Sequence, residues 1–295
     1  MTSIKRLNIL MADDSSQHAQ SAVELIQDLA LPPKSRVMVL RVFTPGQISG
    51  IPEFERSLEK TKQQFLNAGI KAETDLLLGS PAEKIIEIAQ TKRSNLIVMG
   101  AKGLRATLGI LLGGVAQQVV EYAHSPVLVV RAPYQGLQRI LLVTDGSVTS
   151  QLAARYLGKF PLPENADVRV MHVIPPLQPL LTMEPQFGSW QTIYMPPPVE
   201  GDSLLQKKQE RKGQALLSRT CDLLQRHGIS STPVLKQGDA ATEIMEYAKL
   251  NEIDLIVAGS RGLSQFKSLW VGNVPRKLVH YSNCSVLIVK GPKKE

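Results

Sequence analysis

Residues 8–16 of this chain read NILMADDSS, and residues 139–147 read RILLVTDGS. In both segments an apolar run leads into an aspartate, and a serine follows two positions later. The segments align with Asp14 opposite Asp145, at a spacing of 131 residues. Self-similarity at this distance indicates a duplicated structural unit, and a duplication decides the architecture of the whole chain.

The repeat continues beyond these segments. Residues 37–43 and 168–174 align at the same spacing, and four glycine pairs farther along align at a spacing of 159 residues. The glycine pairs are Gly79 and Gly238, Gly100 and Gly259, Gly103 and Gly262, and Gly113 and Gly272. The spacing grows by 28 residues, which predicts a proline-rich insertion at about residues 175–202 of the second copy. We therefore expect two domains, residues 1–133 and 137–295.

Each unit alternates β-branched apolar runs with helical patterns, which predicts a parallel sheet joined by crossover helices. Strands are expected near residues 4–12, 36–43, 71–78, 95–100 and 126–131, and again near 138–144, 167–174, 231–236, 254–259 and 285–290. Helices are expected near residues 16–30, 53–68, 81–93 and 114–124, and again near 149–158, 203–227, 239–251 and 273–283. Right-handed crossovers give two doubly wound α/β domains. In such domains a ligand binds beyond the carboxyl ends of the strands, where the strand order reverses, which we expect between the first and fourth strands.

Polar residues follow the first strand of each unit. Asp14 and Asp145 can accept hydrogen bonds from a base or a ribose hydroxyl, and a ligand role is favoured for them over helix capping. Ser16 and Ser147 start the next helix, and for them helix capping and a ligand role are equally supported.

A glycine-rich loop follows the fourth strand in both units, with the spacing G-x2-G-x9-G. The first copy uses Gly100, Gly103 and Gly113, and the second uses Gly259, Gly262 and Gly272. We expect these glycines to permit positive φ and close backbone approach, and the third to open a helix whose free N–H groups suit a phosphate. Lys102 and Arg105, or Arg261 and Lys267, could add contacts to that anion. Two copies with the same spacing indicate a nucleotide site.

Composition narrows the class of protein. The net charge of +8 is spread as +3 over residues 1–132 and +5 over the rest, so we expect no nucleic-acid partner. Its densest basic cluster, at residues 207–212, fits a solvated helix face. Cys221 and Cys284 are too few for a disulfide framework, and no segment matches a signal peptide or a membrane span. These features predict a cytoplasmic protein without a membrane partner.

On these residues the chain resembles the universal stress protein family in its tandem form. The matching parts are the aspartate after strand one, the valine of strand two, the G-x-x-A loop before helix three, the glycine loop, and the closing strands S-P-V-L-V-V and C-S-V-L-I-V. The resemblance implies that each half adopts the Rossmann-like, adenine nucleotide alpha hydrolase-like fold, with a five-stranded parallel sheet of order 3-2-1-4-5. It also implies that members with the glycine motif bind ATP, with Mg²⁺ held by the phosphates.

The resemblance carries ligand roles to specific positions. Asp14 and Asp145 would bond the ribose or adenine, Val42 and Val173 would meet the base, and the loop glycines would hold ribose and phosphates. The full expected set is Asp14, Val42, Gly100, Lys102, Gly103, Gly113, Gly114 and Val115 in the first half, and Val143, Thr144, Asp145, Val173, Gly259, Arg261, Gly262, Gly272, Asn273 and Val274 in the second.

Two departures from the family pattern rank the sites. After the third glycine the family has Ser or Thr, whereas this chain has Gly114 and Asn273, of which only the asparagine can donate from its side chain. Before the ligand-binding aspartate the first copy has the acidic Asp13, which opposes an anionic ligand, and the second has Thr144. Both differences predict that the second half is the better nucleotide site.

Three functional hypotheses remain open at this stage. The first is a nucleotide-binding stress-response regulator, the second is a nucleotide-free interaction or chaperone-like scaffold, and the third, less favoured, is a slow ATPase. We identify no catalytic residue and no metal ligand in the protein. His172 fits a packed or hydrogen-bonded core residue.

The resemblance also bears on assembly and on the insertion. Residues 125–130 and 284–289 could pair within one chain as the family's dimers do, which makes a pseudo-dimer, and a homodimer or a further protein partner stays open. The insertion, with Trp190 as an anchor, is either a lid over the second site or a mobile loop.

Overall fold

The computed structural model describes residues 6–103, 112–176, 200–262 and 271–291. In the first half, five strands alternate with helices. The strands are β1 (Asn8–Ala12), β2 (Arg36–Phe43), β3 (Lys71–Leu78), β4 (Leu96–Gly100) and β5 (Val127–Val130). The helices are α1 (Gln17–Asp28), the 3₁₀ helix η1 (Pro45–Gly50), α2 (Ile51–Asn67), α3 (Pro81–Thr91) and α4 (Gly114–Tyr122).

The second half repeats this order. Its strands are β6 (Arg139–Val143), β7 (Asp167–Ile174), β8 (Ser231–Gln237), β9 (Leu255–Gly259) and β10 (Ser285–Val289). Its helices are α5 (Val148–Leu157), α6 (Glu200–Gln225), α7 (Ala240–Leu250) and α8 (Asn273–Tyr281). Every predicted strand and helix is therefore present, with ends that shift by a few residues.

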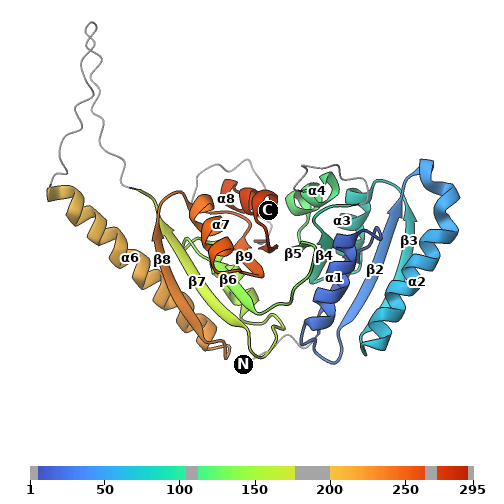
Figure 1. The fold of residues 1–295 in the computed structure, drawn as a ribbon, viewed down its shortest axis with the longest axis horizontal. Coiled ribbons are helices and arrows are strands. Elements are labelled where there is room, and N and C mark those ends of the chain that lie inside the picture. The colour runs from blue at the N-terminus through green and yellow to red at the C-terminus, as the bar shows by residue number, and fades with distance from the viewer. Residues whose placement is uncertain (1–5, 104–111, 177–199, 263–270, 292–295) are drawn as a thin grey trace, which may run out of the picture.

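All ten strands form one sheet, in the order β3-β2-β1-β4-β5-β10-β9-β6-β7-β8. Within each half the order is 3-2-1-4-5 and all pairs are parallel, as expected. The halves join where β5 and β10 pair antiparallel, with Leu128 opposite Leu287. The expected pairing of the two fifth strands within one chain is confirmed, and the two sheets continue into each other (Figure 1).

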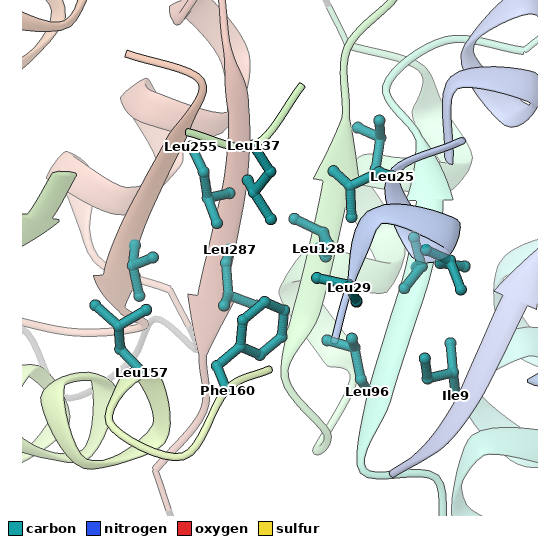
Figure 2. Packing of buried hydrophobic residues seen from close by; sticks show 14 of the residues in the cluster. Ile9, Leu25, Leu29, Leu96, Leu128, Leu137, Leu157, Phe160, Leu255 and Leu287 are labelled. Atoms are coloured by element: carbon teal, nitrogen blue, oxygen red, sulfur yellow. The ribbon is translucent and has the colours of Figure 1, made fainter. Parts of the chain in front are cut away.

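Helices cover both faces of the sheet. One buried cluster holds residues of α1, α2, α5 and α6, and the other holds residues of α3, α4, α7 and α8. Both clusters run through the central strands, so the halves share their core. Figure 2 shows Leu128 and Leu287 with Leu29, Leu137 and Phe160 in the first of these clusters. At about 1.5–3 kcal/mol for each fully buried aliphatic or aromatic side chain, this shared core stabilises the junction.

One predicted boundary was wrong. The first strand begins at Asn8 rather than at residue 4, because its neighbour β2 begins at Arg36, the residue paired with Asn8. The insertion at about residues 175–202 stays a prediction, and α6 begins at Glu200. Residues 177–199, which include Trp190, lie outside the described residues, as does the lid hypothesis.

Candidate functional site

A cavity of about 430 Å³ lies at the carboxyl ends of β1, β2 and β4 in the first half. All eight residues expected in the first site line it, namely Asp14, Val42, Gly100, Lys102, Gly103, Gly113, Gly114 and Val115. The predicted position, between the first and fourth strands, is therefore hollow. Sequence reasoning missed Thr44 and Gln47, at the start of η1, and Pro81 and Ile85 on α3, which also line the cavity. Pro81 lies within the G-x-x-A motif and could have been found from it, whereas no motif marks the other three residues.

The turn between β1 and α1 holds Asp14 against the glycine loop. The Asp14 Oδ1 accepts the Ser16 N–H at 3.0 Å, and a Cβ placed on Gly103 would lie 2.4 Å from Asp14 Oδ2. Ser16 caps α1, because its Oγ accepts the Ala19 N–H at 3.1 Å, and the same hydroxyl donates to the Lys102 carbonyl at 3.1 Å. The capping interpretation of Ser16 is confirmed, and the cap also ties the loop to the first strand.

Asp13 does not face the cavity as a free carboxylate. It is 5% exposed, its Oδ1 accepts the Ser15 N–H at 2.7 Å, and its Oδ2 accepts the Thr61 hydroxyl at 2.7 Å. On the adjacent strand, Arg41 is 7% exposed and donates to the Ser15 Oγ at 2.5 Å. Its guanidinium carbon lies 4.1 Å from the ring centre of Phe54. Asp13 and Arg41 therefore both bond Ser15, and the signal of Arg41 in the sequence was a single arginine within an apolar strand.

The first two glycines of each loop are required by close packing rather than by backbone torsion. A Cβ on Gly100 would lie 2.7 Å from His18 Cβ, and one on Gly259 would lie 2.6 Å from the Thr149 carbonyl carbon. Among the described residues, positive φ occurs at Gly79 and at Gly238, which precede α3 and α7, but not at the loop glycines. The expectation of positive φ in the glycine loop was therefore wrong. Small size explains the first two glycines of each loop, whereas a Cβ on the third would make only ordinary contacts.

The third glycine of each loop opens a helix, as predicted. Gly113 caps α4 with φ −73° and Gly272 caps α8 with φ −70°, and neither offers a side chain to the first turn. The first N–H groups of a helix have no intrahelical acceptor, and together with the helix dipole they favour an anion. In α4 these groups belong to Gly114, Val115 and Ala116, whereas in α8 the third position is Pro275, which has no N–H.

The second half repeats the contacts of the turn and the loop. Asp145 Oδ1 accepts the Ser147 N–H at 3.0 Å, and a Cβ on Gly262 would lie 2.6 Å from Asp145 Oδ2. Ser147 caps α5 and also donates to the Arg261 carbonyl at 3.4 Å. His172 Nδ1 lies 2.8 Å from the Thr144 carbonyl oxygen, which confirms a hydrogen-bonded structural histidine.

The remaining second-half candidates lie on the same edge of the sheet. Val143 ends β6 and Val173 lies near the end of β7, while Asn273 and Val274 begin α8. Gly272 lies against the backbone of Arg261 and Gly262, just as Gly113 lies against that of Lys102 and Gly103. The residues Arg105 and Lys267 fall outside the described ranges.

The model of the universal stress protein family matches this chain twice, at residues 5–131 and 136–290. The chain belongs to the universal stress protein family. A universal stress protein of Methanocaldococcus jannaschii is 44% identical over 158 residues, which are 54% of this chain and 85% of that protein.

Two solved structures resemble this universal stress protein over nearly its full length. One, a universal stress protein of Archaeoglobus fulgidus, has a TM-score of 0.66 and 19% identity and covers 98% of this chain and 97% of its own. The other, described as a putative universal stress protein of Pseudomonas aeruginosa, has a TM-score of 0.66 and 15% identity and covers 97% and 93%. Both support the fold. Over the part of the chain that the structure describes, we find no helix with the length and apolarity needed to cross a bilayer.

Proposed function

We propose that this universal stress protein binds an adenine nucleotide, ATP in particular, at the carboxyl edge of the sheet in each half. The cavity in the first half carries the proposal, because it brings all eight expected residues to one place. The remaining expectations belong to the same proposal, namely a regulatory stress-response role, a cytoplasmic setting, and residues 1–133 and 137–295 as the two functional units.

The chemistry of the cavity fits such a ligand. Leu40, Val42, Ile85 and Met99 contribute apolar lining, which suits a base. Across the cavity, the first turn of α4 offers N–H groups, and Lys102 adds a positive charge, which suits phosphates. Asp14, held by the Ser16 N–H, would accept a ribose hydroxyl. When bound, ATP would bring Mg²⁺ held mainly by its own phosphates and water.

A regulatory role follows if ATP stabilises one conformation that a partner recognises. The shift in that equilibrium is limited to the difference in ATP affinity between the conformations. We retain the ranking of the second half above the first, which rests on Asn273 and on the neutral Thr144 beside Asp145. The buried Arg41 and the missing N–H of Pro275 reduce this difference.

Isothermal titration with ATP, AMP and adenosine, with and without Mg²⁺, tests the proposal on the wild-type chain and on two single variants. We expect two sites, with Asp145→Ala removing the tighter site and Asp14→Ala removing the weaker one. Asp75→Ala, which changes a carboxylate on β3 away from the cavity, is the matched control and should bind like the wild type. No binding at millimolar ATP, together with no nucleotide released from the denatured protein, would favour the nucleotide-free scaffold instead.

A further inference from the structure

Each fifth strand is followed by a cation that reaches the other half. The Arg131 guanidinium, just after β5, donates to the carbonyls of Val279 at 2.7 Å and His280 at 3.2 Å, in the last turn of α8. Lys290, just after β10, is its counterpart in the repeat, and its ammonium donates to the carbonyls of Val120 and Glu121 in the last turn of α4. The last carbonyls of a helix have no intrahelical donor, and a cation there also stabilises the helix dipole. The two halves therefore cap each other's helices.

The capped helices are those that begin at the glycine loops. The loop of each half is in turn bonded to the strand end that precedes its cation. Ala101 N–H donates to the Val130 carbonyl at 2.8 Å, and Ser260 N–H donates to the Val289 carbonyl at 2.9 Å. In each half, the last residue of the fifth strand therefore accepts a hydrogen bond from the glycine loop. The residue that follows it is the cation that caps the helix of the other half.

The two helices also meet at the junction between the halves. Arg276 of α8 forms an ion pair with Glu121 of α4 at 3.0 Å. Leu112 and Val271, which precede the third glycines, line a gap between the helices of only about 10 Å³. Leu112 also lines the cavity of the first half, so one side chain touches both the site and the junction. A close-packed contact of this kind transmits small displacements.

Lys290 is held between the two sites. Burial and, to a smaller extent, the positive charge of Arg261 lower the pKa of Lys290, which Glu121 partly raises again, to about 8. Arg261 belongs to the glycine loop of the second half, and the carbonyls that Lys290 bonds belong to α4 of the first. The same ammonium therefore interacts with elements of both sites.

We infer that Arg131 and Lys290 are positioning residues for the phosphate subsite of the opposite half, Lys290 acting through α4 and Arg131 through α8. This inference rests on the proposed nucleotide function. Its consequence is positive coupling: a nucleotide that orders one loop also fixes the cation that supports the other helix, so the second nucleotide binds more tightly than the first.

The test uses an Asp145→Ala parent, in which we expect only the site of the first half to bind ATP. Lys290, which belongs to the second half, is then changed in this parent. We expect Lys290→Met to weaken ATP binding about two- to five-fold, the range that a charge at a helix terminus typically contributes. Adenosine, which has no phosphate, should bind with unchanged affinity, and Lys290→Arg should restore ATP binding. Lys277→Met, on an exposed lysine of α8, is the control for the loss of one positive charge in the second half.

Arg131→Met in an Asp14→Ala parent applies the same test to the second half. It tests the inference by itself if only the second half binds ATP tightly.

Equal weakening of ATP and adenosine binding shows a merely structural role and overturns the inference, as does unchanged ATP binding. If a methionine variant does not fold, the glutamine variant, which keeps a donor without the charge, is expected to show the same selective loss. Absence of nucleotide binding in both parents and in the wild type overturns the proposed function, and the inference with it, whereas intact parents with unaffected variants overturn the inference alone.

Discussion

The two halves of this protein share one backbone plan and differ in the charges beside the candidate sites. Where the first half buries Asp13 and Arg41, the second has Thr144 and His172 at the corresponding positions. In both halves the aspartate after the first strand accepts the same turn N–H and lies against the same loop glycine. The comparison teaches that the duplication kept the contacts that shape the site and replaced an aspartate and an arginine beside it with a threonine and a histidine.

A second difference lies in the helix that begins at the third loop glycine, where we propose that the phosphates bind. The first three positions of α4 all carry an N–H, whereas Asn273 adds a side-chain donor to α8 and Pro275 removes a backbone donor. Each half therefore has an advantage that the other lacks. Substitutions that exchange these features show whether the ranking of the halves is correct.

The largest effect on stability is expected at the junction between the halves. The question there is whether the two halves unfold as one unit or as two. Leu128→Ala and Leu287→Ala each remove a fully buried side chain from the shared core and should lower the free energy of unfolding by about 2–5 kcal/mol. Because the cluster spans both halves, we expect the halves to unfold in a single transition. Urea unfolding followed by hydrogen exchange at amides of β1 and β6 measures both quantities.

The control for this pair is Leu250→Ala, which changes a leucine that is 81% exposed. It should alter the free energy of unfolding by no more than about 0.5 kcal/mol. Separate transitions for amides of β1 and β6 in either core variant would show that the halves fold independently, despite their common sheet.

The next effect compares the first glycine of each loop. A Cβ on Gly259 would lie 2.6 Å from backbone of α5, whereas a Cβ on Gly100 would meet the His18 side chain at 2.7 Å and its backbone at 2.9 Å. Overpacking costs about 1–3 kcal/mol, and backbone yields less than a side chain, so we expect Gly259→Ala to cost more than Gly100→Ala. Urea midpoints give the order. A negligible cost at both positions would mean that these glycines serve a ligand and not the packing of α1 and α5.

A smaller effect concerns the first residue of the helix proposed to bind the phosphates. Asn273→Gly should weaken ATP binding in the second half, and Gly114→Asn should strengthen it in the first, each by about five- to ten-fold, because one hydrogen bond is lost or gained. Nothing lies within 4 Å of a Cβ on Gly114, so the asparagine fits. Titration with ATP against adenosine gives the readout. Equal changes for both ligands would exclude a phosphate contact at this position.

The fold was predictable because the sequence pattern of strands, helices and motifs occurs twice in the chain. The paired motifs around Asp14 and Asp145 located the duplication, and continuous apolar runs such as residues 96–100 identified buried parallel strands. The eight first-half candidates then followed from their places at the strand ends, and the structure brings them to one cavity. Their ligand roles stay predictions.

What the sequence could not show depends on contacts between distant residues. Arg41 reads as an isolated charge until the structure places it beside Ser15 and Phe54. Gly100 and Gly103 read as flexible positions until their neighbours, a helix and a carboxylate, show that size is the constraint. The mutual capping by Arg131 and Lys290 needs the antiparallel register of β5 and β10, which no local pattern encodes.

The smallest effect is a pH dependence at His18 of the first half, a position that Thr149 occupies in the second. His18 Nδ1 accepts the Ala132 N–H at 2.9 Å, and burial, with Arg131 and Lys102 adding to it, lowers the pKa of His18 below its ordinary 6.5. The unfolded chain then binds the proton more readily than the folded one, so this contribution to stability is complete above pH 6.5 and is lost as the pH falls below it. We expect the urea midpoint of the wild type to fall more between pH 7.5 and pH 5.5 than that of His18→Asn, which keeps an acceptor but does not titrate. The other histidines are common to both proteins, so their effects cancel in the difference, and equal falls would mean that protonation of His18 leaves the contact between α1 and residue 132 intact.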